Sequence, residues 1–110
     1  MLVPNAENAV VDIRKLRDYC LNPNHEVGKH KARVFASALN LTENDAGELQ
    51  TALLEAVKVS DAEIGRLDKY GQHYTVDFEF ERQGKFAIIR SGWIIDTNSD
   101  VPRLVTCLII

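Results

Sequence analysis

The sequence is short of the residues that mark disulfide frameworks and metal sites. It has two cysteines, Cys20 and Cys107, and no second Cys or His lies at metal-ligand spacing around either one. Such sparse usage favours reduced, buried thiols, although one disulfide between a helix and a late strand remains an alternative. The sequence also lacks a phosphate-binding glycine loop, a dinucleotide fingerprint and a serine-hydrolase elbow, so no cofactor is predicted.

Long hydrophobic runs are absent as well. The longest apolar stretch, LVTCLII at the C-terminus, is far shorter than the ~18–20 residues that cross a bilayer. The first residues, MLVPNAENAV, have neither a basic region nor a long apolar region, so no signal peptide is expected. These two absences predict a cytoplasmic protein without membrane contact.

The sequence also has no excess of positive charge. Thirteen Lys and Arg stand against 16 Asp and Glu, which gives a net charge of −3 and excludes a uniformly basic nucleic-acid binder. The 110 residues predict a single domain over residues 1–110, since domains commonly run to ~100–150 residues. The composition is near the globular average, which argues against a disordered chain, a collagen and a coiled coil.

The net charge conceals two segments of opposite sign. Between Arg14 and Arg33 there are six Lys and Arg but two acids, and His25 and His30 lie in the same segment. Between Glu43 and Glu81 there are ten acids but three Lys and Arg. The basic segment favours an anionic partner there, whereas the simpler interpretation is two ordinary solvated faces.

Apolar residues recur at helical spacing in the first half of the chain. Asp12 is expected to cap a short helix that ends before Asn22-Pro23, and a second helix is expected from Lys29 to Leu39. Thr42 and Asp45 resemble a capping box at the start of a third helix, about Glu43 to Val57. The apolar stripe expected on that helix consists of Ala46, Leu49, Leu53, Ala56 and Val57.

The period changes to two in the second half. HYTVDFEFER alternates strictly and predicts an antiparallel strand with one buried face. Further strands are expected over residues 86–95 and 103–109, and residues 63–69 are a weaker strand candidate. Helices followed by strands predict an α+β fold: about three N-terminal helices and then a three- or four-stranded antiparallel sheet with the helices on one face. The apolar end, Leu108-Ile109-Ile110, should be buried in the sheet or in a dimer contact, so an oligomer through the last strand is a further expectation.

Reactive side chains are concentrated in the segment from His25 to Lys31. A histidine can carry protons near neutral pH, and a nearby lysine can stabilise charge on a phosphate. Together they would suit cleavage of RNA by internal attack of the 2′-hydroxyl, although a histidine just before a helix is more often a cap. His25 and Lys31 are the first candidates, with Lys29, His30 and Arg33 as secondary ones; the spacing of the histidines argues against a metal site.

Two further candidates lie in the strands. Arg90 interrupts an apolar run, so it should either pair with Asp77 or Glu79 or point into a cleft that binds phosphate. Thr106 is expected to share a face with Leu104 and Leu108, where its hydroxyl would bond to the backbone or to a ligand. The enzyme hypothesis requires His25, Lys31, Arg90 and Thr106 to surround one cleft.

Several motifs resemble a family of small bacterial domains of uncharacterised function. They are Leu21-Asn22-Pro23-x-His25-x-x-Gly28-x-x-Lys31-Ala32-x-x-Phe35, Pro4-Asn5-Ala6, Tyr70-Gly71, Arg90-Ser91-x-Trp93 and Pro102-Arg103-Leu104-Val105-Thr106. Members of that family occur as separate short chains, and similar domains occur at the C-terminal ends of bacterial polymorphic toxins. The resemblance implies a toxin-associated domain.

The order of elements also resembles the small metal-independent RNase fold of barnase-like, colicin-like and RelE-like toxins. That analogy implies a catalytic set of His25, Lys31, Arg90 and Thr106, with RNA as substrate and an antidote protein as partner. Acidic residues on the first strands, such as Asp77, Glu79 and Glu81, would repel RNA if they line the exposed sheet face. The alternative is therefore a non-catalytic interaction or immunity-type module that uses its acidic sheet face.

Overall fold

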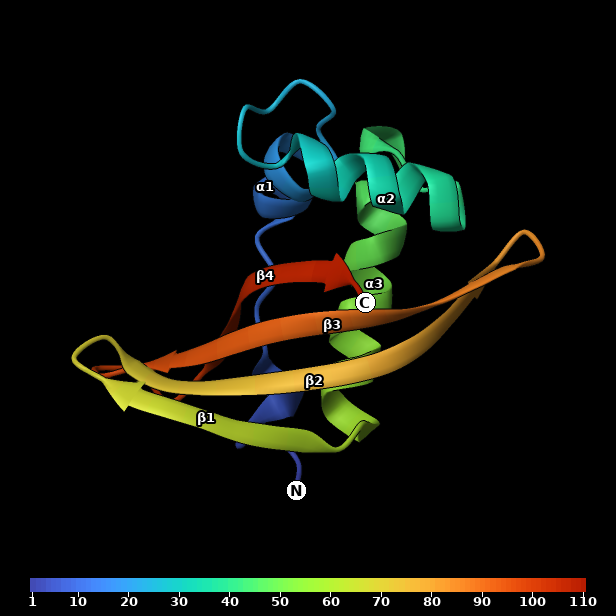
Figure 1. Cartoon of the computed structure of the whole chain (residues 1–110). Helices are drawn as coiled ribbons and strands as arrows, with labels where there is room; N and C mark the ends of the chain where they lie inside the picture. Colours follow the sequence, from blue (N-terminus) through green and yellow to red (C-terminus); the bar gives the residue numbers. More distant parts are fainter.

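A short 3-10 turn and three longer helical segments precede four strands along the chain (Figure 1). The structure, a computed structural model, describes residues 1–110. The helical part consists of the short 3-10 turn η1 (Ala6–Asn8), α1 (Ile13–Lys15) running directly into the π-helical turn η2 (Leu16–Cys20), α2 (Lys29–Leu39), the 3-10 turn η3 (Glu43–Asp45) and α3 (Ala46–Val59). None of these helices is long and apolar enough to cross a membrane.

The helix ends follow the local signals in the sequence. The Asp12 side chain accepts a hydrogen bond from the Arg14 backbone N–H at 3.0 Å, and this bond starts α1. The predicted bounds of α2 are confirmed, and Asn40 ends that helix in the left-handed region. The predicted capping box between Thr42 and Asp45 is also present, but it starts η3, and α3 then runs two residues further than expected.

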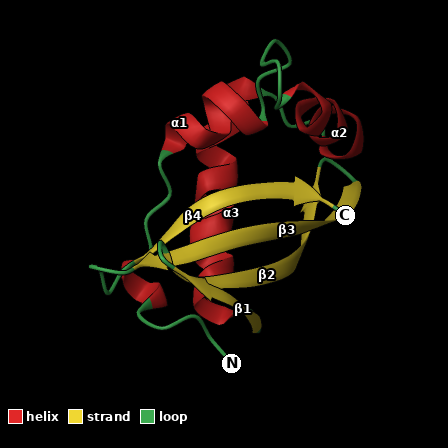
Figure 2. Cartoon of the chain, turned by 60° about the vertical axis from the view of Figure 1, so that its left-hand side comes forward, coloured by secondary structure: helices red, strands yellow, loops and turns green.

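The strands form one antiparallel sheet in the order β1-β2-β3-β4. They are β1 (Ala62–Asp68), β2 (Gly71–Arg82), β3 (Lys85–Asp96) and β4 (Pro102–Ile109). Figure 2 shows α3 crossing behind the sheet, while α1 and α2 lie beyond the β4 edge. The predicted α+β class and the order of helices and strands are thus confirmed.

The alternation of β2 divides the sheet into two faces. Tyr74 and Val76 are buried on the inner face, which is covered by the helices, and Trp93 and Ser91 oppose them on β3. The Ser91 hydroxyl donates to the Val76 carbonyl at 2.7 Å and accepts from the Trp93 indole N–H at 2.9 Å. The Ser91-x-Trp93 motif therefore satisfies its polar groups inside the core and serves the fold.

The outer face carries the alternate residues of the same strands. On β2 these residues are Thr75, Asp77, Glu79 and Glu81, and their partners on β3 are Gly92, Arg90, Ile88 and Phe86. Asp77, Glu79 and Glu81 are exposed, as the alternation predicts.

A β-bulge changes the face on which Thr106 lies. The register shifts between Gly92, which pairs with Thr106, and Trp93, which pairs with Leu104. Leu104 is therefore buried on the inner face with Trp93, and Thr106 lies on the outer face. The prediction that Thr106 and Leu104 share a face is wrong. It assumed strict alternation along the strand, whereas the bulge inserts one extra residue, Val105, between them.

Candidate functional site

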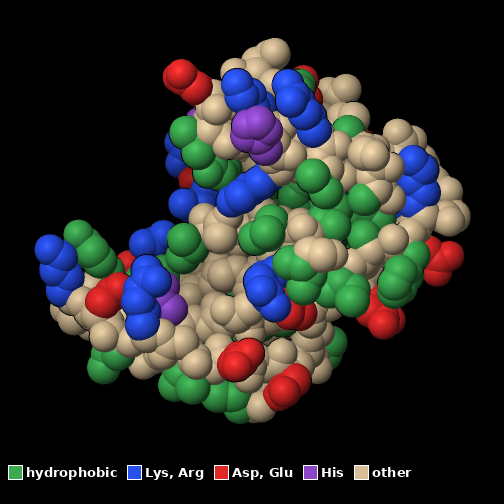
Figure 3. Space-filling view, in the orientation of Figure 1, with side chains coloured by type: hydrophobic (Ala, Val, Ile, Leu, Met, Phe, Trp, Pro, Cys, Tyr) green, Lys and Arg blue, Asp and Glu red, His purple; other side chains and the backbone are tan.

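A cleft of about 750 Å³ opens between the N-terminal helices and β4. Figure 3 shows Lys and Arg side chains around the hollow between the upper helices and the sheet. The residues that line the cleft come from α1, η2, the loop before α2, the first turn of α2 and β4: Asp12, Arg14, Lys15, Asp18, Tyr19, His25, Lys31, Val105 and Thr106. Three of the four predicted site residues, His25, Lys31 and Thr106, thus converge on one cleft.

Lys31 and Thr106 are joined directly. The Lys31 ammonium donates a hydrogen bond of 2.8 Å to the Thr106 hydroxyl oxygen, across 75 positions of the chain. The ammonium also lies over the Tyr19 ring, 5.4 Å from its centroid. Because the Thr106 oxygen accepts from Lys31, its own O–H is free to donate toward the cleft, and Lys31 keeps two further N–H donors.

The loop before α2 is held against η2 by Gly28. A side-chain carbon at position 28 would lie only 2.3 Å from the Tyr19 carbonyl oxygen, so no larger residue fits there without moving the backbone. This close approach brings the His25 ring to 4.6 Å from the Tyr19 ring, edge to face. Gly28 therefore fixes the distance between the two aromatic side chains of the cleft.

His25 caps the turn that leads into α2. Its Nδ1 accepts hydrogen bonds from the backbone N–H groups of Val27 and Gly28, at 3.1 and 2.9 Å. Two donors pointing at Nδ1 require a lone pair there, so the ring carries its proton on Nε2. The ring can donate through Nε2–H, but its lone pair is engaged, so catalysis by His25 as a general base would first require these two bonds to break.

The cleft holds two lysines without an acidic partner. Lys15 and Lys31 have no carboxylate within ion-pair distance, whereas Asp12 is paired with Arg14 at 2.7 Å and Asp18 with Arg17 at 2.9 Å. The hydrogen bonds from Arg14 lower the pKa of Asp12 to about 2, so this carboxylate stays ionised and neutralised. The uncompensated charge in the cleft is therefore positive and suits an anionic ligand.

The two cysteines lie together behind the cleft. Both are free and buried, one in η2 and the other in β4 next to Thr106. A hydrogen bond from the Cys107 thiol lowers the pKa of Cys20 to about 7, and the charges of Lys31 and Lys15 act in the same direction. The same pairing with Cys20, together with burial, raises the pKa of Cys107. The two cysteines link η2 to β4, next to the strand position that holds Thr106.

The structure does not bring Arg90 to the cleft. Its guanidinium makes two hydrogen bonds of 2.9 Å to the Asp77 carboxylate on the outer face, which is the pairing the sequence left open. This pairing lowers the pKa of Asp77. The secondary candidates Lys29 and His30 do not line the cleft either, and Arg33 lines a separate hollow beside Pro23 and Thr42.

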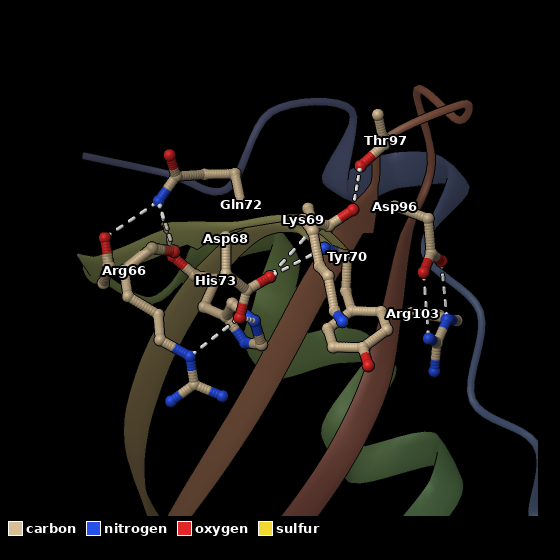
Figure 4. A network of polar contacts seen from close by, with 11 residues as sticks. Arg66, Asp68, Lys69, Tyr70, Gln72, His73, Asp96, Thr97 and Arg103 are labelled. Carbon is tan, nitrogen blue, oxygen red and sulfur yellow. Dashed lines mark hydrogen bonds and ion pairs between the residues drawn. The ribbon is translucent and has the colours of Figure 1, made fainter.

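A second polar network lies at the opposite end of the sheet, in the turn between β1 and β2 (Figure 4). The Asp68 carboxylate accepts from Arg66, from the backbone N–H groups of Tyr70 and Gly71, and from His73, at 2.9 to 3.2 Å. These bonds, led by that of Arg66, lower the pKa of Asp68 to about 2. The network closes the hairpin, and Gly71 is required in it because a side-chain carbon there would clash with the Ile95 carbonyl oxygen.

Sequence reasoning did not assign six of the nine lining residues to the site, and Arg14, Lys15 and Tyr19 are the most informative of them. Arg14 and Lys15 lie in the basic segment that the charge distribution singles out, so that signal was present. Tyr19 has no comparable signal, because its place in the cleft depends on the π-helical turn and on contact with Gly28.

Comparisons with known proteins agree with this fold. The chain resembles a chain of the solved structure described as "Contact-dependent growth inhibition toxin - immunity protein complex from Klebsiella pneumoniae 342". The TM-score is 0.71 at 18% identity, over 94% of this chain and 95% of that one, and this likeness establishes the fold. No curated protein matches. A family described as a domain of unknown function, DUF6883, matches residues 2–110, and the chain therefore belongs to that family.

Proposed function

We propose that the chain is the toxin component of a toxin–immunity pair and that its cleft cleaves RNA in the cytoplasm. The observation that carries the proposal is the contact between Lys31 and Thr106, which places an unpaired ammonium and a free hydroxyl together in a cleft of positive charge. The fold is shared with a chain of a toxin–immunity complex, and this likeness supports a place for the chain in such a pair.

The proposed reaction is internal attack of a ribose 2′-hydroxyl on the adjacent phosphorus. The 2′-hydroxyl loses its proton to solvent, the 2′-oxygen–phosphorus bond forms and the bond to the 5′ oxygen breaks. The products are a 2′,3′-cyclic phosphate and a 5′-hydroxyl, whose proton the Lys31 ammonium can supply. No redox step or cofactor is involved.

The protein contributes mainly by stabilising charge on the phosphate. Lys31 supplies a cation, while the Thr106 hydroxyl and Nε2–H of His25 supply hydrogen-bond donors to the non-bridging oxygens. Lys15 adds a second unpaired cation at the rim of the cleft. Arg90 has no part in this proposal, because Asp77 already neutralises it.

The test is induced expression in bacteria, followed by growth measurement and analysis of RNA from the same cultures. We expect growth arrest and RNA fragments with 2′,3′-cyclic ends for the wild type, and neither for Lys31→Met. Lys29→Met is the matched control, because Lys29 lies on the same helix but outside the cleft. A wild-type protein that is harmless and inactive on purified RNA would contradict the proposal.

A second candidate is a non-catalytic binding module of the immunity type. It is favoured by Nδ1 of His25, which is occupied as a cap, and by the exposed carboxylates on the outer face of β2. Expression that is harmless alone, and that protects cells from a toxin encoded beside it, would favour this candidate over the first.

A further inference from the structure

An exposed apolar strip lies on the outer sheet face, over the start of β3 and the end of β4. Phe86 and Ile88 on β3 are 59% and 37% exposed, and Ile110 after β4 is 54% exposed. Figure 3 shows hydrophobic side chains gathered over this half of the face. We call the following residues the outer strip: Val34, Phe86, Ile88, Leu108 and Ile110.

The backbone pairing makes these residues neighbours. The Ile110 N–H donates to the Ile88 carbonyl at 3.1 Å, and Leu108 shares the outer face with Thr106 because the two are two positions apart along β4. Val34 follows Lys31 by three positions on α2, on the helix side that reaches the outer face. The strand residues of the outer strip are therefore neighbours, and Val34 lies on α2, which packs against both β3 and β4.

Acidic side chains border the strip along β2. Glu81 lies opposite Phe86, and Glu79 lies opposite Ile88, so both β3 residues of the outer strip have a carboxylate as their cross-strand neighbour. No Lys or Arg lies within ion-pair distance of Glu79 or Glu81. The next pair along the strands is Asp77 with Arg90, where the carboxylate is neutralised within the chain.

We propose that the outer strip, with Glu79 and Glu81, is the surface on which the protein partner of the pair docks. An exposed apolar patch with a polar border is typical of a protein interface. The unpaired carboxylates define the chemistry of the partner, which presents apolar side chains surrounded by Lys and Arg. This inference rests on the proposed toxin–immunity pairing but not on RNA cleavage.

The outer strip lies beside the cleft, so a partner bound to the strip would also block access to the cleft. Thr106 and Leu108 are successive outer-face residues of β4, so the strip begins where the cleft ends. A protein seated on the strip stands at the rim of the cleft and obstructs an RNA strand that crosses the sheet. Docking there would inhibit the chain without replacing the contact between Lys31 and Thr106.

The test measures binding of this chain to the purified product of the adjacent gene, with affinities from titration calorimetry and association rates from stopped-flow mixing. We expect Phe86→Ser and Ile88→Ser to weaken binding by about 30-fold or more each, as central apolar anchors do. Glu79→Lys should slow association by about 10-fold at low salt and reduce its salt dependence. Matched controls are Val10→Ser beside the start of β4, which is 52% exposed, and Glu7→Lys in η1; neither should alter binding.

The outcomes separate this proposal from RNA cleavage. Phe86→Ser should keep wild-type RNA cleavage and the wild-type unfolding temperature while losing the partner. If the wild type cleaves no RNA but binds through the strip, the proposed enzyme fails and the docking surface stands. Binding that depends on Lys31 and not on Phe86 would overturn the docking surface. So would failure to bind the product of either neighbouring gene, or a homodimer of the isolated chain that Ile88→Ser dissociates.

Discussion

The Lys31 ammonium and the Thr106 hydroxyl form a hydrogen bond of 2.8 Å that joins the first turn of α2 to the last strand. Thr106→Val removes the hydroxyl but keeps the shape of the side chain, so the fold should remain intact. We expect RNA cleavage to fall about 100-fold, because one donor to the transition state is lost. Single-turnover cleavage of a short RNA measures this rate.

Thr51→Val is the control for that substitution. Thr51 lies on α3, and its hydroxyl donates only to the Gly47 carbonyl in the same helix. The Thr51→Val variant should cleave RNA at the wild-type rate. A Thr106→Val variant that cleaves RNA as fast as the wild type would remove Thr106 from the proposed site.

His25 offers a way to separate capping from catalysis. His25→Asn should keep the cap, since an Asn oxygen accepts from backbone N–H groups two and three positions ahead, but it removes Nε2–H. We expect its free energy of unfolding to stay near that of the wild type while RNA cleavage falls. His25→Ala should lose both the cleavage and about 1 kcal/mol of stability.

Urea denaturation and the RNA cleavage assay together decide the role of His25. If His25→Asn cleaves RNA at the wild-type rate and only His25→Ala is impaired, the side chain is a cap and nothing more. His30→Asn is a matched control, because His30 is exposed and lies outside the cleft.

Local signals account for the parts of the fold that the sequence predicted. The bounds of α2, the Asp12 cap and the capping box of Thr42 and Asp45 all depend on contacts between residues a few positions apart. The alternation of β2 is equally local, because every second side chain meets the same core. Such features are readable from a single sequence.

The site depended on contacts that no local pattern contains. Thr106 changed face because a bulge lies opposite Trp93, and Tyr19 reached the cleft because Gly28 lets the backbone approach it. Arg90 interrupts an apolar run in the sequence, but the side chain across the strand pair decided its partner. Residue type therefore indicated the candidate groups, and strand register and backbone packing decided which of them met.

The Arg90–Asp77 pair should contribute to stability and not to RNA cleavage. Both side chains are more than a third exposed, so we expect Arg90→Met to lower the free energy of unfolding by less than about 1 kcal/mol. Its RNA cleavage rate should equal that of the wild type. A double-mutant cycle with Asp77→Asn, followed by urea denaturation, isolates the pair. A marked loss of cleavage in Arg90→Met with unchanged stability would return Arg90 to the site.

Asp68 should make the stability of the chain depend on pH in the acid range. Its pKa in the folded chain is about 2, below the value of about 3.9 in an unfolded chain, so the unfolded state binds more protons between these values. The stabilisation is therefore complete above about pH 4 and is lost as the pH falls toward about 2. Asp68→Asn keeps an oxygen that accepts from the backbone N–H groups of Tyr70 and Gly71, but it removes the charge that Arg66 and His73 contact.

Urea denaturation of the wild type and of Asp68→Asn, repeated from pH 7 to pH 3, measures this effect. We expect the variant to be less stable at pH 7, and we expect the difference to narrow once the pH falls below about 4, since the wild-type chain then loses what the variant already lacks. Asp100→Asn is the matched control, because the Asp100 side chain is exposed and its carboxylate makes no hydrogen bond, so the variant should be as stable as the wild type at pH 7. A difference for Asp68→Asn that stays constant down to pH 3 would mean that the turn between β1 and β2 is held by its backbone hydrogen bonds and not by the charge of Asp68.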